Sequence, residues 1–418
     1  MTGLGRRAVL AAAAPLLAGF RSASGNQVQA PRRRRLSFGL RSSQTALVTV
    51  PQLTTYLLTV TLEAPFDAVR VGLANSTPDP FRIGGICCCE ADLWQPVQSA
   101  HWRYFSFGRT TGETIGPGLT GPQACTVPGN VPATTGARNV PRLFWSDWIE
   151  YRTAVAQGRP QMLFRALVPP QALPMTRPFG PGYVEKVVPE SGPRFIKEAE
   201  IPGDFVTDLS ITAPLPQISH VSPLFVIQYR SINPGFQIVV GGDSHLSSWF
   251  TFSGVAAFRM SQPSLPVSMW NVAWGGQPSN TFWPTLDEAI DAGAPSIVLI
   301  EGWTANDGMR PERDEAYLAR VQETASRTMR QGGIPIILKG LPRTLYAKPE
   351  VGSWLHVNRQ LDDLVPGAVV FDPDPIVQDP DRPGDWRPGF SNDTIHPNQD
   401  ANFALAGPFQ RLLRSLGV

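Results

Sequence analysis

The spacing of hydrophobic residues differs between the two halves of the chain. From about Leu36 to Pro223, short runs rich in β-branched and aromatic residues are interrupted by proline and glycine, and long helical periodicity is largely missing. The predicted strands there include Leu57–Leu62, Ala68–Leu73 and Phe205–Thr212, and the predicted loops include Thr126–Arg138 and Val168–Pro181. We therefore predict a mostly β, sandwich-like domain over residues 36–222.

From about Phe236 onward, short and almost purely apolar runs alternate with amphipathic segments. Such runs between helices are typical of a parallel sheet that is covered on both faces. The predicted strands are Phe236–Val240, Val267–Ala273, Ser296–Ile300, Ile334–Leu338 and Val369–Phe371. The predicted helices are Ser247–Met260, Thr285–Ala292, Arg313–Arg330, Val351–Leu364 and Ala401–Leu416. Residues 223–418 are thus predicted to form an α/β domain with a doubly wound, five-stranded parallel sheet, whose active site would lie at the carboxyl ends of the strands.

The N-terminal residues have the pattern of an export signal. Arg6 and Arg7 precede an apolar run from Ala8 to Phe20, which is shorter than the roughly 20 residues needed to span a bilayer. The arginine pair resembles a twin-arginine signal. We expect residues 1–30 to direct export to the periplasm or the cell exterior, and a short helix or an uncleaved anchor is the alternative. No later segment has the length and hydrophobicity expected of a membrane span.

Composition and charge narrow the field of functions. Hydrophobic residues make up 42% of the 418 residues and charged residues 17%, which is enough apolar surface for a sizeable core. The net charge of +2 gives no strong field of the kind that marks a nucleic-acid binder. Arg32–Arg35 form a basic run, which we interpret as a solvated linker over residues 31–35 in preference to a patch for anionic lipid or nucleic acid.

Four cysteines are present, and three of them, Cys87, Cys88 and Cys89, are consecutive. Consecutive cysteines do not have the spacing of a zinc site, in which about two to four residues separate the ligands. In an exported protein, the alternatives are a disulfide from Cys125 to one of the three and a buried reduced cluster. No metal or cofactor is expected.

Two motifs at predicted strand ends carry candidate chemistry. Gly241-Gly242-Asp243-Ser244 follows the first strand, where a serine entering a helix exposes its hydroxyl close to amides that stabilise negative charge. Asp393 and His396 lie one turn apart before the last helix, so an acid can orient a histidine that accepts a proton from serine. Taken singly, each motif also fits an ordinary helix cap.

Two further loops offer hydrogen-bond donors and aromatic rings. Gly276 follows the second strand, where a glycine lets a backbone N–H approach a ligand, and Asn306 follows the third strand with a side-chain amide that can donate to an oxyanion. A plain turn and an Asx turn are the alternatives. Trp274 and Trp303 stand in the same loops and are candidates for substrate binding, because tryptophan faces stack on sugar rings. Core packing is the alternative for both rings.

The order of these blocks resembles the SGNH (GDSL-type) hydrolases over roughly residues 236–418. That family is named after a Ser, Gly, Asn and His in four blocks, in this chain order, at the ends of a flavodoxin-like sheet. The resemblance implies Ser244 as the nucleophile, His396 as the base and Asp393 as the acid that orients the base. A flavodoxin-like SGNH hydrolase fold is therefore expected for the second half, and the resemblance says nothing of the first.

The resemblance also implies an oxyanion hole. Its donors would be the amides of Ser244 and Gly276, with Gly275 as the alternative, and the side chain of Asn306. The first block departs from the family pattern in reading Gly-Asp-Ser-His-Leu. His245 is a rival base in principle, but adjacent residues at a helix start point apart.

A serine esterase that hydrolyses carboxylic esters follows from this resemblance. An exported SGNH-type enzyme with an added β domain is similar to some carbohydrate esterases, so we favour an ester substrate of the acetylated polysaccharide class. The alternatives are a lipase- or thioesterase-like acyl hydrolase, an O-acyltransferase, and a carbohydrate-binding protein with an idle esterase fold. No cofactor, metal or nucleic-acid partner is expected.

Overall fold

The computed structural model describes most of the chain between Pro31 and Gly417. The predicted export signal, the predicted helix Ser247–Met260 and Trp274 lie outside the described residues. The described ranges are 31–41, 45–92, 95–96, 101–108, 115–130, 142–153, 159–176, 196–207, 217–218, 221–246, 265–273, 275–276, 278–307, 311–343 and 348–417. No helix in these ranges has both the length and the hydrophobicity to cross a membrane.

Parallel strands form the centre of the second half. They pair in the order β18, β17, β19, β20, β21, and every pairing among them is parallel. Their carboxyl ends therefore lie at one edge of the sheet. The bounds are β17 Leu224–Gly241, β18 Val267–Asn271, β19 Ile297–Glu301, β20 Ile334–Leu338 and β21 Val369–Phe371.

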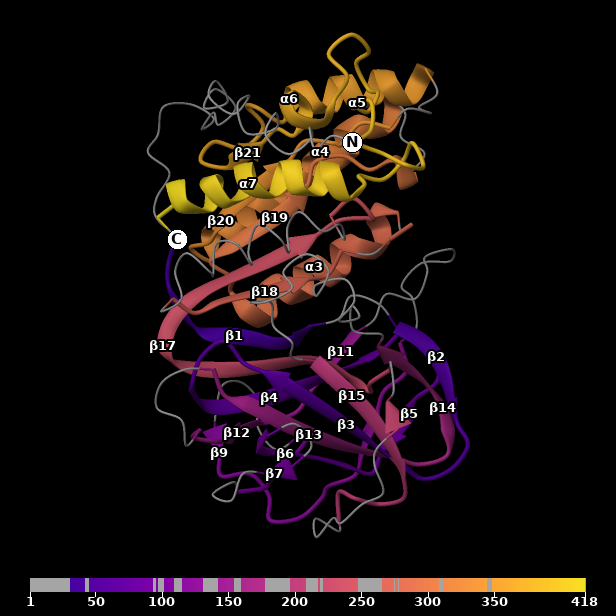
Figure 1. Ribbon diagram of the computed structural model, residues 1–418, viewed down its shortest axis with the longest axis vertical. Helices are drawn as coiled ribbons and strands as arrows, with labels where there is room; N and C mark the ends of the chain where they lie inside the picture. The colour runs from indigo at the N-terminus through magenta and orange to yellow at the C-terminus, as the bar shows by residue number, and fades with distance from the viewer. Residues whose placement is uncertain are drawn as a thin grey trace, which may run out of the picture.

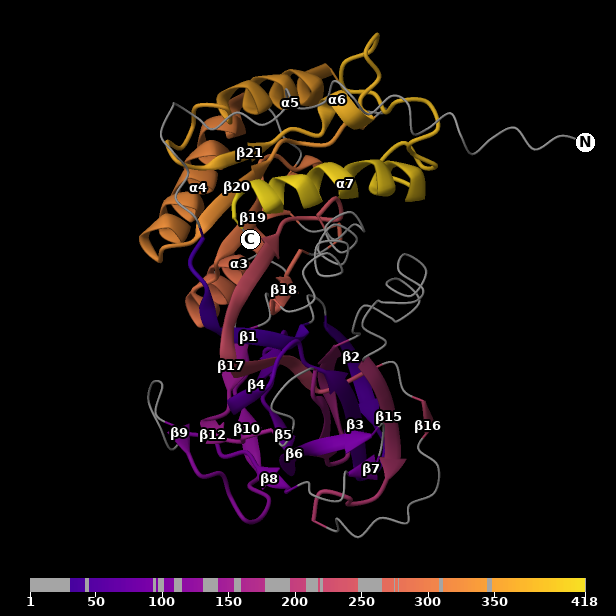
Figure 2. The ribbon, with the colours of Figure 1, turned by 60° about the vertical axis from the view of Figure 1, so that its left-hand side comes forward.

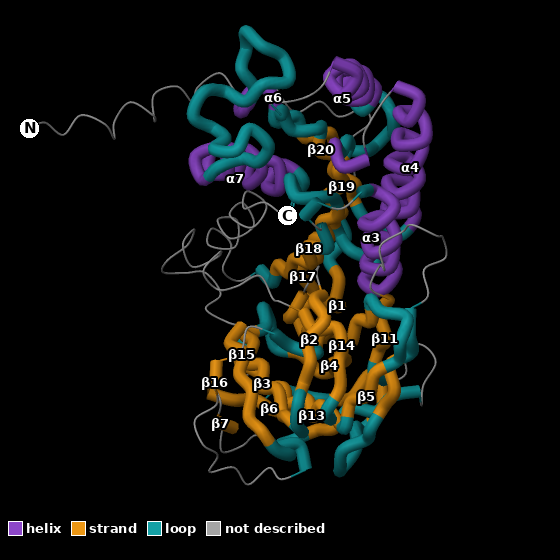
Figure 3. The backbone as a smooth tube through the Cα atoms, turned by 90° about the vertical axis from the view of Figure 1, so that its right-hand side faces the viewer, coloured by secondary structure: helices purple, strands orange, loops and turns teal. Residues whose placement is uncertain are grey.

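Helices cover both faces of this part of the sheet (Figure 3). Alternate strand residues point to opposite faces, so that Val239 packs with α3, α4 and α5 while Ile238 packs with α7. Each aliphatic side chain buried in this way contributes about 1.5–3 kcal/mol. The bounds are α3 Ser279–Gly293, η2 (a 3₁₀ helix) Ala305–Asp307, α4 Pro311–Arg330, α5 Lys348–Gln360, α6 Asp374–Val377 and α7 Gln399–Ser415.

The described part of the first half is built from strands that belong to several sheets. One sheet contains β16, β15, β3, β13, β6, β7 and β8, while β4, β11, β12, β9 and β1 belong to the sheet that continues into the second half. A single apolar cluster includes residues of β3 and β13 as well as β4 and β17. The bounds are β1 Arg34–Arg41, β2 Thr45–Val50, β3 Thr54–Thr61, β4 Phe66–Asn75, β5 Phe81–Ile83, β6 Gly85–Asp92, β7 Gln95–Pro96, β8 Arg103–Tyr104, β9 Ile115–Gly116, β10 Cys125–Val127, β11 Arg142–Trp145, β12 Trp148–Glu150, β13 Gln161–Val168, β14 Gln171–Thr176, β15 Ile196–Pro202 and β16 Gln217–Ile218.

One long strand, β17, belongs to both halves (Figures 1 and 2). Its residues 224–231 pair antiparallel with β4, and its residues 236–241 pair in parallel with β18 and β19. The predicted boundary at residue 222 falls just before this shared strand. A fragment that ended there would lose the pairing of β17 with β4 and with β1, although β4 would keep β11 and β12, so the two halves share strand pairing.

The basic run is not a free linker. Arg34 and Arg35 belong to β1, which pairs with β17. The Arg35 guanidinium donates to Asp67 Oδ2 at 2.8 Å and to the carbonyl oxygen of Ser231 at 3.1 Å. The interpretation as a solvated linker is therefore wrong for Arg34 and Arg35, which belong to β1, while Arg32 and Arg33 precede the strand and are exposed.

The four cysteines are free thiols, so of the two alternatives the structure has the reduced cysteines and not the disulfide. Cys87, Cys88 and Cys89 occupy consecutive positions of β6, so their side chains alternate between faces and join different apolar clusters. Burial raises the pKa of Cys89 and of Cys125 to about 12, which disfavours the thiolate that disulfide formation requires.

Two local predictions in the first half are also wrong. The predicted strand at Phe205 is a turn in its described residues, because Asp204 Oδ1 accepts hydrogen bonds from the amides of Val206 and Thr207. The predicted loop Val168–Pro181 contains β14, which pairs only with β2 among the described strands. A strand at such an edge tolerates the proline that argues against one in a sheet interior.

Candidate active site

The turn after β17 carries Ser244 to the edge of the sheet. Gly242 packs so closely on Glu301 that a Cβ would lie 2.3 Å from the carboxylate oxygen, which leaves room for glycine alone. Glu301 ends β19, and its carboxylate accepts a hydrogen bond from the amide of Asp243. The turn is thereby fixed, with Ser244 partly exposed between the buried residues Asp243 and His245.

The loop before α7 folds around the carboxylate of Asp393. Its Oδ1 accepts hydrogen bonds from the amides of Ile395 at 2.9 Å and His396 at 2.7 Å. Thr394 has a φ of 66°, a left-handed conformation that β-branched residues rarely adopt. Strained residues of this kind cluster at functional sites, where the surrounding contacts hold them. The side chain of Asn398 caps α7, so the loop is anchored at both ends.

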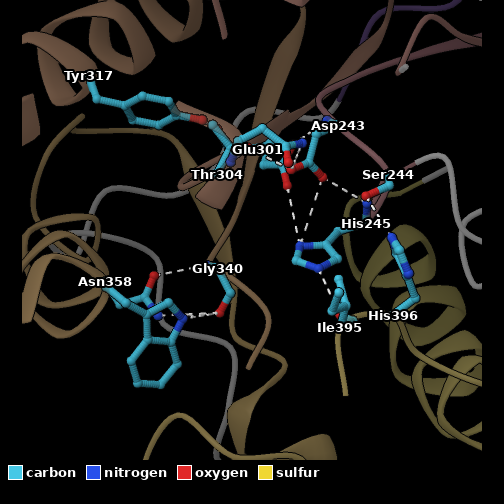
Figure 4. A network of polar contacts seen from close by, with 12 residues as sticks. Asp243, Ser244, His245, Glu301, Thr304, Tyr317, Gly340, Asn358, Ile395 and His396 are labelled. Atoms are coloured by element: carbon cyan, nitrogen blue, oxygen red, sulfur yellow. Dashed lines mark hydrogen bonds and ion pairs between the residues drawn. The ribbon is translucent and has the colours of Figure 1, made fainter. Parts of the chain in front are cut away.

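The two loops bring the predicted Ser, His and Asp side chains into a hydrogen-bonded row. His396 Nδ1 lies 2.7 Å from Asp393 Oδ2, and His396 Nε2 lies 3.0 Å from Ser244 Oγ, across 152 positions of chain. A carboxylate oxygen only accepts hydrogen bonds, so Nδ1 carries the proton and Nε2 can accept one from the serine hydroxyl. Figure 4 shows the Ser244 side chain beside the ring of His396.

Hydrogen bonds hold the charge on Asp393. Partial burial by itself would raise the pKa of this carboxyl, but donors from His396 and the amide of Ile395 outweigh it, and the pKa of Asp393 lies well below its ordinary value. Because the folded pKa is lower than the unfolded one, the ionised form favours folding. This contribution is complete above the ordinary carboxyl pKa and is lost as pH falls through the lowered one. Solvent screens it, since the Asp393 side chain is 52% exposed.

We expect the acid side of the pH–activity profile to follow a single ionisation. Asp393 keeps its charge where histidine bases titrate, so only a proton on the base interrupts proton transfer from Ser244. The logarithm of kcat/KM should fall with unit slope as pH decreases. Hydrolysis of an aryl ester measured from about pH 4 to about pH 9 checks this, and a slope of two would mean that the carboxyl titrates as well.

The predicted oxyanion donors lie in loops that follow β18 and β19. Gly276 is exposed in a turn with a φ of 68°, and open space surrounds the position of a Cβ. Asn306 lies in η2, where its Nδ2 donates to Asp243 Oδ2 at 2.9 Å and its amide donates to Thr304 Oγ1 at 3.2 Å. The carboxylate of Asp243 therefore orients the Asn306 amide group, which carries a second hydrogen.

Only one of the two tryptophans predicted to bind substrate, Trp303, is among the described residues. Trp274 lies outside the described residues. Trp303 is fully buried in the core beneath α5, where its Nε1 donates to Ser353 Oγ at 3.1 Å. A ring enclosed by core side chains offers no face to a sugar, so the expectation for Trp303 is corrected to core packing.

A buried polar cluster behind Ser244 goes beyond the sequence predictions. Asp243 Oδ2 accepts hydrogen bonds from Thr304 Oγ1 at 2.6 Å and from Asn306, and its Oδ1 accepts one from the amide of His245 at 2.8 Å. The Thr304 side chain is fully buried, and its hydroxyl is held by the Asp243 carboxylate. These bonds tie the turn after β17 to the loop after β19.

His245 is part of the same cluster and is not placed to act as the base. Its side chain is 3% exposed, and its Nε2 lies 3.1 Å from the carbonyl oxygen of Ile395. The signal for this cluster in the sequence is Glu301, a carboxylate that ends an otherwise apolar strand. A charge at such a position needs buried partners.

Three residues of the cluster have the spacing of a possible metal site. Asp243, His245 and Glu301 each offer a ligand atom within 4.8 Å of the others. Three of the four carboxylate oxygens, however, already accept hydrogen bonds from protein donors. The fourth, Glu301 Oε1, faces His245 Nδ1 at 3.7 Å. We interpret the cluster as a hydrogen-bonded network.

The chain matches no protein-family model and no curated protein. It is similar to a number of solved structures. A GDSL-like lipase from Bacteroides thetaiotaomicron is 14% identical, with 43% of this chain and 88% of that chain covered and a TM-score of 0.34. An esterase from Pseudoalteromonas sp. is 17% identical, with 43% and 93% covered and a TM-score of 0.31. An acetylxylan esterase from Geobacillus stearothermophilus is 15% identical, with 43% of this chain and 94% of that chain covered and a TM-score of 0.36.

Proposed function

We propose that this chain is a serine carboxylic-ester hydrolase in which Ser244 is the nucleophile, His396 the base and Asp393 the acid that orients it. The observation behind this proposal is the unbroken row of hydrogen bonds from Asp393 Oδ2 through the His396 ring to Ser244 Oγ. A hydroxyl bonded to a histidine that is itself bonded to a carboxylate is the arrangement that activates serine.

The reaction follows from the position of the protons. Ser244 Oγ attacks the ester carbonyl carbon while its proton passes to His396 Nε2. The tetrahedral intermediate collapses when the bond to the alcohol oxygen breaks, and His396 returns the proton to that oxygen. Water then gives a proton to His396 and attacks the acyl-enzyme, which releases the carboxylic acid and restores Ser244. Asp393 stabilises the imidazolium at each stage.

The proposed oxyanion hole consists of the amides of Ser244 and Gly276 and the side chain of Asn306. Support comes from the bond between Asn306 and Asp243, which fixes the amide group next to the nucleophile turn. Preorganised donors of this kind stabilise the developing negative charge without reorganisation, and each is worth about 10²–10³-fold in rate.

The proposed architecture assigns a catalytic unit to residues 223–418 and an accessory β-sandwich unit to residues 36–222. The parallel strand order with helices on both faces supports a doubly wound, flavodoxin-like SGNH hydrolase fold for the catalytic unit. The apolar cluster that includes residues of β3 and β13 as well as β4 and β17 supports a sandwich in the first half.

Export to the periplasm or the cell exterior is part of the proposal. Its support is the arginine pair at positions 6 and 7 ahead of the apolar run from Ala8 to Phe20. An O-acetylated polysaccharide outside the cytoplasm is then the substrate class we favour.

A cavity in the first half, whose lining residues include carboxylates and guanidinium groups, supports a carbohydrate substrate. It has a volume of about 600 Å³ and is open to solvent. Carboxylates, guanidinium groups and a phenol can satisfy several sugar hydroxyls at once. The lining residues are Glu90, His101, Arg103, Pro117, Glu150, Tyr151, Arg152 and Thr153.

The acyl preference tests this choice of substrate. Across p-nitrophenyl esters of increasing chain length, we expect kcat/KM for the acetate to exceed that for the octanoate by at least about tenfold, because a pocket sized for acetyl excludes longer chains. Activity that rises with chain length would instead indicate a lipase- or thioesterase-like enzyme. Acyl transfer to an added sugar that exceeds hydrolysis would indicate an O-acyltransferase.

A further inference from the structure

His245 connects the turn that carries the nucleophile to the loop that carries the base. It directly follows Ser244, and its Nε2 lies 3.1 Å from the carbonyl oxygen of Ile395, the residue before His396. The rings of His245 and His396 also pack edge to face, with centroids 6.1 Å apart and an interplanar angle of 71°. The buried His245 side chain therefore contacts both the main chain of the loop that carries His396 and the His396 ring itself (Figure 4).

The hydrogen bond to Ile395 fixes the tautomer of His245. A carbonyl oxygen only accepts, so Nε2 carries a hydrogen. Nδ1 is buried with no hydrogen-bonding partner among the described residues, and it faces Asp243 Oδ1 at 3.8 Å and Glu301 Oε1 at 3.7 Å. The lone pair on Nδ1 would be repelled by two ionised carboxylates, so the cluster of His245, Asp243 and Glu301 needs one further proton.

The position of Glu301 Oε1, which faces His245 Nδ1 at 3.7 Å, and the electrostatics of the cluster favour Glu301 as the group that carries this proton. Burial, and then the charge of Asp243 and a side-chain hydrogen bond with it, raises the pKa of Glu301 well above its ordinary value. Burial lowers the pKa of His245 in spite of the opposing effect of Asp243. A protonated Glu301 can turn its hydroxyl toward Nδ1. The other charged or titratable groups facing the pair are His396 and Arg343 around His245, and Asp307 and Tyr317 around Glu301.

We propose that His245 is a positioning residue that holds the backbone of Ile395, and with it the ring of His396, in line with Ser244, and that Glu301 keeps the His245 ring in the tautomer that this task requires. The inference rests on the proposed hydrolase function, because it concerns the alignment of its base. It assigns a role in the reaction to two residues that never touch the substrate.

Two substitutions separate this role from a merely structural one. His245→Phe keeps a ring against His396 but removes the donor to Ile395, so we expect kcat for an aryl ester to fall about 10- to 100-fold with KM changed less than about twofold. Glu301→Gln has the shape of a protonated glutamic acid and can still accept from the Asp243 amide and donate to Nδ1. It should stay within about threefold of the parent protein at every pH, whereas Glu301→Ala should fall as His245→Phe does.

The measurements use the whole chain and count active molecules. A fluorophosphonate titrates functional Ser244 in each variant, so kcat is expressed per active site and incomplete folding does not mimic a positioning defect. His356→Phe, an exposed histidine of α5, is the matched control and should leave kcat unchanged. His245→Gln, whose amide can reach toward Ile395, should recover part of the lost rate.

Three results would overturn the inference. The first is a parental kcat per active site in His245→Phe, and the second is a loss in Glu301→Gln as large as in Glu301→Ala. The third is a stoichiometric metal in the purified protein that disappears with His245→Phe, which would make the cluster a metal centre. Failure of the hydrolase proposal itself is distinguishable, because it would appear as undiminished turnover in Ser244→Ala.

Discussion

Ser244→Ala is expected to lower kcat/KM for an aryl ester by about 10⁴- to 10⁶-fold. The change removes the atom that forms the acyl-enzyme and leaves His396 with no hydroxyl to deprotonate. Ser244 is only partly buried, so the fold should persist and the thermal unfolding midpoint should move by less than about 2 °C. Steady-state kinetics and circular dichroism on the same preparation provide the two readouts.

Ser415→Ala is the matched control for this substitution. That hydroxyl is exposed at the end of α7 and bonds only locally, to the carbonyl oxygen of Leu412. The control should keep full turnover. Ester hydrolysis by Ser244→Ala at the parental rate would exclude Ser244 as the nucleophile.

Asp393→Asn is expected to lower kcat by about 10³- to 10⁴-fold with little change in KM. Asp393 Oδ1 accepts hydrogen bonds from the backbone amides of Ile395 and His396, and its Oδ2 accepts one from the His396 ring. An asparagine that keeps its oxygen on the amides turns its NH₂ toward Nδ1. The ring must then carry its proton on Nε2, where it cannot accept one from the serine. The reverse orientation of the amide places the NH₂ against two backbone donors.

The exposed Asp363 supplies the control for charge alone. Asp363→Asn removes a carboxylate just beyond α5 and should leave kcat unchanged. If Asp393→Asn retains more than about a tenth of the parental kcat, the Asp393 carboxylate is not the group that orients the base.

Strands covered on both faces were the most predictable elements, because most of their positions are apolar and the apolar runs stand out from the segments around them. β20 and β21 have the predicted bounds, Ile334–Leu338 and Val369–Phe371, and β19 is displaced by one residue from its prediction. The prediction begins β17 at Phe236, although the strand begins at Leu224. Asn233-Pro234-Gly235 has the pattern of a chain break, and the strand continues through it because β1 and β4 hold the residues before it.

The first half was less predictable because its strands depend on distant partners. Arg34 and Arg35 have the composition of a linker, and only their contacts with Asp67 and with β17 make them part of a strand. The strand predicted at Phe205 gives way to a turn because one local carboxylate, Asp204, captures two amides. Neither the strand at Arg34 and Arg35 nor the turn at Phe205 can be predicted without knowing which groups lie next to each other in the fold.

The candidate site divides in the same way. The contact between Asp393 and His396 follows from their spacing on one turn, and the meeting of Ser244 with His396 follows from the order of strand ends. The network of Glu301 and His245 could not be predicted from the sequence. Its hydrogen bonds depend on the burial of both side chains and on which carboxylate oxygen faces which ring nitrogen. Trp303 illustrates the opposite error, since an aromatic residue in a catalytic loop can still point into the core.

Covalent trapping is the most direct test of Ser244 as an activated nucleophile. The protein is treated with an alkyl fluorophosphonate, digested, and mapped by mass spectrometry while residual esterase activity is followed. We expect one adduct, on Ser244, whose formation parallels the loss of activity, is absent in Ser244→Ala and is strongly slowed in Asp393→Asn. Complete inactivation with the adduct on another residue, or full turnover by protein already modified at Ser244, would contradict the mechanism.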